Sequence, residues 1–378
     1  MSDVIDSLWN YMPEEIIACI FSFLSVTDRH TVSHVCRKWA EAVASPAVWR
    51  FTDLSFDFKE EEEVCILSPL EPYLVYIRHL RIELNHMLDI NRNLVTELLE
   101  MLSDKKAKLQ VLCIIGQGWC PYFDTGQEIL ESVGSYCQSD NKTHLQHVNF
   151  QHMPFVLDNF TVLLLAYRSP HLHTLMLNNQ SPAPIILKPE TIVEIVQACP
   201  KLTVLGIYYA VLSKDLLQEL VKPNRGPFEC LDIFYEYLDK QIPEECWATM
   251  SKRHPQFRVK LEIGAMVDPS KLTDLLKPQI PVKHLQFNYL HYLIRELGLI
   301  TKFYSQTVET LSMYTAPSDD LNAALIELAK KCSRLKEVHC FCVVSRAVVV
   351  TFLSHCSGLQ NYTLSTKLIP SMLPIVCP

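Results

Sequence analysis

Two patterns of apolar residues divide this chain. Between residues 9 and 51 the apolar side chains recur at spacings of three and four, which indicates short amphipathic helices. From residue 77 onward they follow the pattern L-x-x-L-x-L, in which other apolar residues replace some leucines. Alternating apolar residues are typical of a strand with one buried face. The patterns therefore predict an N-terminal helical segment followed by a series of short strands.

The strand pattern repeats along the rest of the chain. Successive copies begin about 28 residues apart on average, which lies within the range of leucine-rich repeats. A weaker copy at 257–263 keeps the alternation but lacks the three-residue step. The full copies are Ile77-Leu80-Ile82, Leu109-Leu112-Ile114, Leu145-Val148-Phe150, Leu172-Leu175-Leu177, Leu202-Leu205-Ile207, Phe228-Leu231-Ile233, Val282-Leu285-Phe287, Val308-Leu311-Met313, Leu335-Val338-Cys340 and Leu359-Tyr362-Leu364.

The segments between the copies are long enough for helices. One strand and one helix cannot bury their apolar faces alone, whereas a stack of such units can. We therefore predict an α/β fold, a solenoid with a curved parallel sheet and outer helices; an unrelated α/β protein with irregularly spaced leucine strands is the alternative. Cys199, His254, Cys332 and Cys356 each precede a strand copy by three residues and are expected to pack at the ends of helices. The expected helices include 94–102, 129–136, 192–196, 216–220 and 321–328.

The N-terminal segment contains signals for three helices. Pro13 followed by two glutamates favours a helix N-terminus, because its φ is fixed and the charge complements the helix dipole. Thr27 or Asp28 is expected to cap the second helix. Ser45-Pro46 is expected to end the third. Three such helices cannot bury all of their apolar groups, so the surplus surface implies a partner.

The N-terminal segment resembles an F-box. That pattern consists of Leu-Pro-x-Glu, spaced aliphatic residues, a central Asp, Val-Cys-x-x-Trp and a closing Trp. Met12 stands where the pattern has Leu, a replacement of similar volume. An ordinary helical cap on a larger domain is the alternative interpretation. The matching residues are Pro13, Glu15, Ile16, Ile20, Leu24, Asp28, Val35, Cys36, Trp39 and Trp49.

An F-box followed by such repeats resembles the F-box/leucine-rich-repeat proteins over nearly the whole chain. This resemblance implies a substrate receptor of an SCF-type cullin-RING ubiquitin ligase, which binds the adaptor Skp1 and through it cullin-1 and its RING subunit. The implied domains are an F-box at 1–54, a linker at 55–69 with the acidic run Glu60–Glu63, and a substrate-binding solenoid at 70–378. Two segments, 321–328 and 336–345, are similar to one numbered member of the family. A repeat scaffold with no part in ubiquitination remains the alternative function.

The resemblance also assigns the adaptor contacts. Its docking surface comprises the matched positions of the F-box, which we expect to bind Skp1. These residues are Pro13, Glu15, Ile16, Ile20, Leu24, Val35, Cys36, Trp39 and Trp49.

Strand geometry predicts where a substrate binds. Residues next to the inward positions of each strand face away from the core, and in a curved solenoid they line the concave side. An aromatic residue directly follows the inward pair in four copies: Tyr208, Phe234, Tyr314 and Phe341. Aromatic residues in such a row resemble binding hot spots, so we expect these four to contact the substrate; the alternative is that they fill the trough against one another. Asn178 and Asn288 are predicted to lie in the same row, and other outward positions include Asp232, Glu337 and His339.

Composition restricts the class of protein. Hydrophobic content of 49% and charged content of 20% are typical of a globular protein, and a net charge of −8 argues against a nucleic-acid partner. We expect no secretory signal and no membrane span, because no sufficiently long apolar run occurs. The 14 cysteines are scattered without a C-x-x-C pair, which favours free thiols and a location in the cytoplasm or nucleus.

The sequence carries no recognisable catalytic motif. His339, Cys340 and Cys342 include metal-ligand types, but the strand register turns both cysteines into the core beside Val338. We therefore predict a non-catalytic adaptor with no catalytic residue, no metal site and no cofactor.

Overall fold

The structure is a computed structural model that describes residues 9, 11–58, 67–117, 125–139, 143–179, 181, 184–236, 241–264, 267, 271–290 and 292–367. The chain divides into two compact units, Met1–Leu202 and Thr203–Pro378. The acidic run predicted as a linker, Glu60–Glu63, lies outside the described residues.

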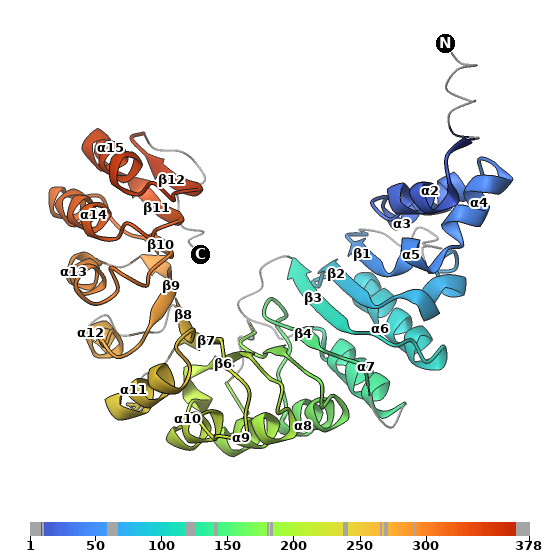
Figure 1. Cartoon of the computed structure of the whole chain (residues 1–378), viewed down its shortest axis with the longest axis horizontal. Helices are drawn as coiled ribbons and strands as arrows, with labels where there is room; N and C mark the ends of the chain where they lie inside the picture. Colours follow the sequence, from blue (N-terminus) through green and yellow to red (C-terminus); the bar gives the residue numbers. More distant parts are fainter. Residues whose placement is uncertain are drawn as a thin grey trace, which may run out of the picture. The chain divides into compact units, whose positions relative to one another are not determined.

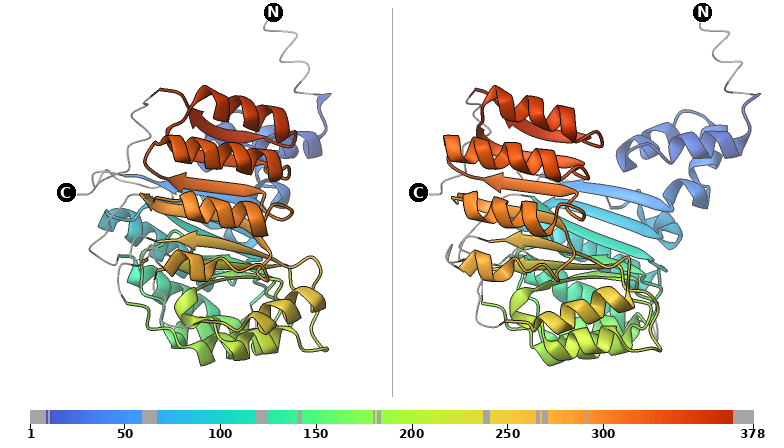
Figure 2. Two further views of the ribbon diagram at one scale, coloured as in Figure 1. Left: turned by 90° about the vertical axis from the view of Figure 1, so that its left-hand side faces the viewer. Right: turned by 60° about the vertical axis from the view of Figure 1, so that its left-hand side comes forward.

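The first unit begins with short helices that pack beside the first strands (Figures 1 and 2). Ser25, and neither Thr27 nor Asp28, caps the second of them: its hydroxyl accepts from the Asp28 backbone N–H at 3.1 Å. The predicted cap was wrong because the helix begins before Thr27, at Val26. Pro46 ends the third helix as predicted, and it also opens one further turn. The helices are α2 (Glu14–Phe21), α3 (Val26–Ser33), α4 (Arg37–Val43) and α5 (Pro46–Trp49).

Parallel strands and helices alternate through the rest of the first unit. Strands β1 to β5 pair in chain order, and helices α6 to α8 lie along one side of them (Figure 1). The strands are β1 (Phe51–Phe56), β2 (His79–Asn85), β3 (Val111–Gln117), β4 (His147–Asn149) and β5 (Thr174–Met176). The helices are η1 (Glu71–Tyr76), α6 (Asp89–Asp104), α7 (Gln127–Gln138), α8 (Asn159–Arg168) and α9 (Pro189–Ala198).

The second unit repeats this alternation, again with its strands parallel and its helices on one side. Figure 2 shows α13, α14 and α15 stacked over their strands. The strands are β6 (Val204–Tyr208), β7 (Cys230–Tyr235), β8 (Arg258–Ile263), β9 (Val282–Leu290), β10 (Thr310–Tyr314), β11 (Glu337–Val343) and β12 (Asn361–Ser365). The helices are η2 (Tyr209–Val211), α10 (Lys214–Leu220), α11 (Glu244–Arg253), α12 (Leu272–Leu275), α13 (Ile294–Phe303), α14 (Asp319–Lys331) and α15 (Arg346–His355).

The predicted α/β repeat fold is confirmed. Every copy of the strand pattern, including the weak copy at β8, coincides with a strand. The inward residues of every full copy except the last are buried between sheet and helices, as Leu80, Leu205 and Leu311 illustrate. One strand was missed: β1 lies at the end of the segment predicted as F-box and pairs with β2 from Phe51 onward. The ladder of strands therefore begins before residue 70, where the solenoid was predicted to start.

Cys199 and His254 are buried at the ends of helices, as expected from the sequence, and their polar atoms also join successive repeats. The Cys199 thiol approaches the carbonyls of Ala166 and Ser169 at 3.5 and 3.6 Å. His254 links two chain segments, because its Nδ1 accepts from the Phe228 N–H at 3.2 Å and its Nε2 donates to the Leu220 carbonyl at 3.1 Å. These contacts satisfy backbone groups that the ends of helices and strands would otherwise leave unpaired.

Candidate functional site

One face of helix α2 is apolar and open to solvent. Ile17 and Phe21 are buried against the other helices, whereas Ile16 is 50% exposed and Ile20 is 38% exposed. Ile16 and Ile20 are four residues apart and therefore lie on the same side of the helix. Pro13 forms the N-cap and is exposed, and its carbonyl accepts from the Ile16 N–H at 3.1 Å.

The junction of α3 and α4 adds to the exposed apolar surface. Val35 is 59% exposed, and Cys36 beside it is exposed. Leu24 and Trp39 are half-buried. The Trp39 ring packs edge-on against Phe21, with ring centroids 5.3 Å apart, so one side of this indole belongs to the helical core.

Trp49 differs from the other residues expected to bind the adaptor, because it is only 1% exposed. Its ring stacks on Tyr73 with centroids 4.3 Å apart, and Arg29 lies over it at 5.2 Å. Its indole N–H donates to the Val43 carbonyl at 2.7 Å. A side chain enclosed on every side has no surface to offer a partner. Trp49 instead fixes the N-terminal helices to the element η1.

Sequence reasoning assigned no role to two large apolar side chains of this region. Phe23 is 85% exposed and follows the end of α2, and Tyr11 precedes that helix and is 87% exposed. Phe23 belongs to the same apolar series as Ile20, but spacing alone does not say which members of a series face solvent.

The second unit presents the sheet face that its helices leave uncovered, which we call the open face. The outward residues of β6 to β12 lie on it in register. One row runs through Tyr208, Phe234, Glu262, Gln286, Ser312, His339 and Thr363.

The four aromatic residues expected to bind substrate form two pairs on the open face. The rings of Tyr208 and Phe234 meet edge-on with centroids 6.1 Å apart. Those of Tyr314 and Phe341 stack at 4.4 Å. Tyr208 is only 5% exposed, whereas the other three are half-buried. The rings thus partly pack against one another, as the alternative interpretation expected, and Tyr208 mainly supports Phe234.

Polar side chains lie on the strands between the two aromatic pairs. The Asn288 amide donates to the Glu262 carboxylate at 2.7 Å and accepts from the Gln286 amide at 2.6 Å. In the row next to that of Glu262, the Lys260 ammonium group pairs with the Asp232 carboxylate at 3.7 Å. Burial raises the pKa of both the Glu262 and the Glu236 carboxyl groups, although the Asn288 hydrogen bond opposes the shift at Glu262.

Comparisons with known proteins relate this architecture to a family. A family model described as F-box-like matches residues 9–55. F-box/LRR-repeat protein 8 of Homo sapiens is 35% identical over 361 residues, which are 93% of this chain and 94% of the human protein. This chain belongs to the F-box/LRR-repeat protein family.

Further relatives support the assignment. F-box/LRR-repeat protein 8 of Mus musculus is 34% identical over 98% of each chain. F-box/LRR-repeat protein 21 of Mus musculus is 22% identical over 92% of this chain and 80% of that protein. The similarity to the member numbered eight confirms the resemblance that segments 321–328 and 336–345 indicated.

The cysteine pair of this F-box/LRR-repeat protein is part of the core. Cys340 and Cys342 are both buried, and their sulfur atoms lie 3.5 Å apart. The contact with the Cys342 sulfur, together with burial, raises the pKa of the Cys340 thiol. The described residues contain no group of three or more His, Cys, Asp or Glu side chains arranged to hold a metal ion. None of the helices in the described ranges is both long and apolar enough to cross a membrane.

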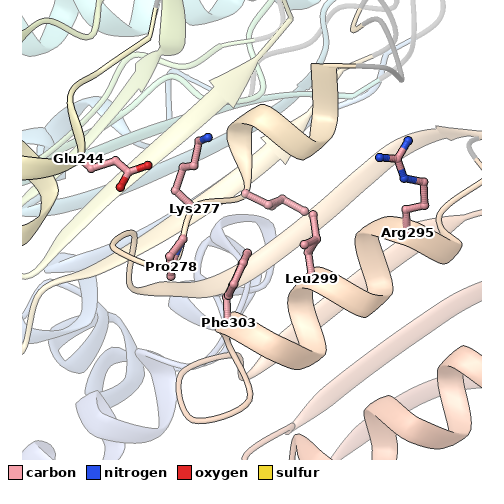
Figure 3. Close-up of a pocket in the computed structure, with 7 residues that line it drawn as sticks. Glu244, Lys277, Pro278, Arg295, Leu299 and Phe303 are labelled. Atoms are coloured by element: carbon pink, nitrogen blue, oxygen red, sulfur yellow. The ribbon is translucent and has the colours of Figure 1, made fainter.

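A depression of about 550 Å³ lies on the helical side of the second unit. Figure 3 shows Pro278, Leu299 and Phe303 along one side of it and the charged Glu244, Lys277 and Arg295 at its rim. Its lining includes no cysteine, serine or histidine. The sequence predicted recognition instead for the exposed face of α2 and for the open face.

Proposed function

We propose that this F-box/LRR-repeat protein is the substrate-recognition subunit of an SCF-type ubiquitin ligase. In this role the N-terminal helices bind Skp1, and through it cullin-1 and its RING subunit. The observation that carries the proposal is the exposed apolar surface on helices that the F-box-like model matches. Exposed aliphatic side chains that share a helix face are typical of a surface that a partner covers.

The docking surface that we propose contains eight of the nine residues expected from the sequence. Pro13, Ile16, Ile20 and Val35 supply exposed apolar area at its centre. Glu15, Leu24, Cys36 and Trp39 complete it. Trp49 contributes indirectly, by holding the helices in place from the core.

The repeats recruit the protein to be modified, with the open face of the second unit as the binding surface. Phe234, Tyr314 and Phe341 make the contacts, and Tyr208 supports them from below. The role is non-catalytic. A receptor that holds a substrate beside a ligase-bound conjugating enzyme raises the rate by proximity. The free cysteines among the described residues fit a reducing compartment, so we place the protein in the cytoplasm or nucleus.

The adaptor interaction is tested with the double variant P13A/I16A. Truncation of both side chains is expected to weaken Skp1 binding by roughly 2–4 kcal/mol, which is a 30- to 900-fold rise in Kd. The measurement is the Kd of purified full-length protein for Skp1. The matched control is I186A, because Ile186 is equally exposed at 50% but lies outside the F-box. Unchanged Skp1 affinity of P13A/I16A, with the fold intact, contradicts the docking surface.

The alternative function is a repeat scaffold whose N-terminal helices only close the stack. It predicts that Skp1 and cullin-1 are not captured at all. The same binding experiment, performed on the wild-type chain with both proteins, separates the two functions.

A further inference from the structure

Two carboxylates, those of Glu236 and Glu262, lie on the open face beside Phe234. Glu262 is in register with Phe234 on one side and with Gln286 on the other. Glu236 follows Phe234 by two residues and lies on the same face. A Cβ atom at Gly264 would come within 2.8 Å of the Glu236 side chain and 3.2 Å of the Phe234 ring. Both side chains therefore extend over the end of β8 at Gly264, two residues from Glu262 along the chain.

The cations on the strands around these carboxylates have partners of their own. Among the described residues of β6 to β10, they are Arg258, Lys260 and Lys283, and Lys283 pairs with Glu309 at 3.6 Å. The Arg258 guanidinium donates to the carbonyls of Pro255 and Phe257, at 3.1 and 2.7 Å, near the beginning of β8. Lys260 pairs with Asp232 one row away. The hydrogen-bonding partner of Glu262 is the neutral amide of Asn288.

A carboxylate that is partly desolvated and bonded to a neutral group gains most from a cation. Burial, which desolvates the carboxylates, raises the pKa values of Glu236 and Glu262. The Phe234 ring lies beside the Glu236 side chain at Gly264 and is in register with Glu262, and the faces of aromatic rings attract guanidinium and ammonium groups. This part of the open face therefore matches a cationic side chain in charge and offers it an aromatic ring.

We infer that the recruited protein presents a lysine or arginine side chain to Glu236 and Glu262, beside Phe234. This inference rests on the proposed function, because it names the chemistry of the segment that the open face recruits. A basic, unphosphorylated segment fits. A phosphorylated or acidic segment is repelled, since its charge has the same sign as the two carboxylates.

The test uses the full-length protein bound to Skp1 and four immobilised heptapeptide libraries. Their central residue is arginine, lysine, glutamate or phosphoserine, and the remaining positions are random. We expect the arginine or lysine library to retain at least about tenfold more protein than the glutamate library, in line with the energies of desolvated charge pairs. The difference between the arginine and lysine libraries shows which cation the site prefers.

Variants assign the effect to the site. E236Q/E262Q keeps the shape of both side chains and removes their charge, so the preference for a central cation should disappear. E327Q is the matched control, because Glu327 is an exposed carboxylate on α14 that pairs with Lys330. It should retain the wild-type preference.

The outcomes separate the inference from the function on which it rests. Equal retention of all libraries, retention of none, or a cation preference that survives E236Q/E262Q overturns the inference. In each of these cases, binding of Skp1 in the same preparation means that the proposed receptor function is not contradicted. Failure of the wild-type chain to bind Skp1 counts instead against the proposed function.

Discussion

Replacement of Trp49 distinguishes a core residue from a partner contact. The indole is 1% exposed, stacks on Tyr73 and donates to the Val43 carbonyl. W49A removes a buried aromatic side chain and is expected to destabilise the protein by about 3–5 kcal/mol. W49F keeps an aromatic ring against Tyr73 but leaves the Val43 carbonyl without its donor. Its expected cost is smaller, about 1–2 kcal/mol.

The assay for Trp49 has two parts, both on the full-length chain. Urea unfolding followed by circular dichroism should rank the variants in the order wild type, W49F, W49A, from most to least stable. Skp1 affinity, measured on the folded W49F protein, should equal that of the wild type. Loss of Skp1 binding by W49F without a change in the unfolding midpoint would refute the reasoning. Trp49 would then be a docking contact, as the F-box pattern alone suggests.

Two further predictions concern stability and pH. H254A should destabilise the protein by about 2–4 kcal/mol, because it leaves the Phe228 N–H and the Leu220 carbonyl unpaired. Burial lowers the pKa of His254 in the folded protein, so the stabilisation by its neutral form is present above the ordinary pKa of 6.5 and is lost as the pH falls below that value. In urea titrations, the stability difference between wild type and H254A should therefore be smaller at pH 5.5 than at pH 7.5. E262Q should raise the midpoint of thermal unfolding at pH 7.5, because the raised pKa of Glu262 means that its ionised form opposes folding. The gain should shrink as the pH falls toward the ordinary pKa of 4.5. A lower midpoint for E262Q than for the wild type at pH 7.5 would contradict this prediction.

The sequence was sufficient to predict the repeat fold because one side of each strand must be buried. The inward residues recur with period two inside each copy, and even the weak copy at β8 kept this alternation. β1 was missed although Thr52, Leu54 and Phe56 alternate in the same way and are buried. Its strand begins only two residues after Trp49, so the helical pattern of the F-box obscured it.

Partner-facing and core-facing residues were harder to separate. The F-box pattern contains both Ile16 and Trp49, but only contact with Tyr73, which is distant in sequence, determines that Trp49 is buried. The outward position of Tyr208 was predicted from the strand register, but its burial depends on the ring of Phe234 on the next strand. Periodicity identifies the face of an element on which a residue lies. The side chains that cover that face belong to other elements, and only the tertiary fold brings them there.

The central claim is that adaptor binding and substrate binding use separate surfaces of this protein. The most direct measurement compares P13A/I16A with Y314A/F341A in cells. For each variant, Skp1 capture and the half-lives of proteins that accumulate when cullin activity is blocked are measured together. We predict that P13A/I16A loses Skp1 and stabilises those proteins, whereas Y314A/F341A retains Skp1 and still stabilises them. Normal turnover with Y314A/F341A, provided that it folds and binds Skp1, would contradict substrate recruitment by the open face.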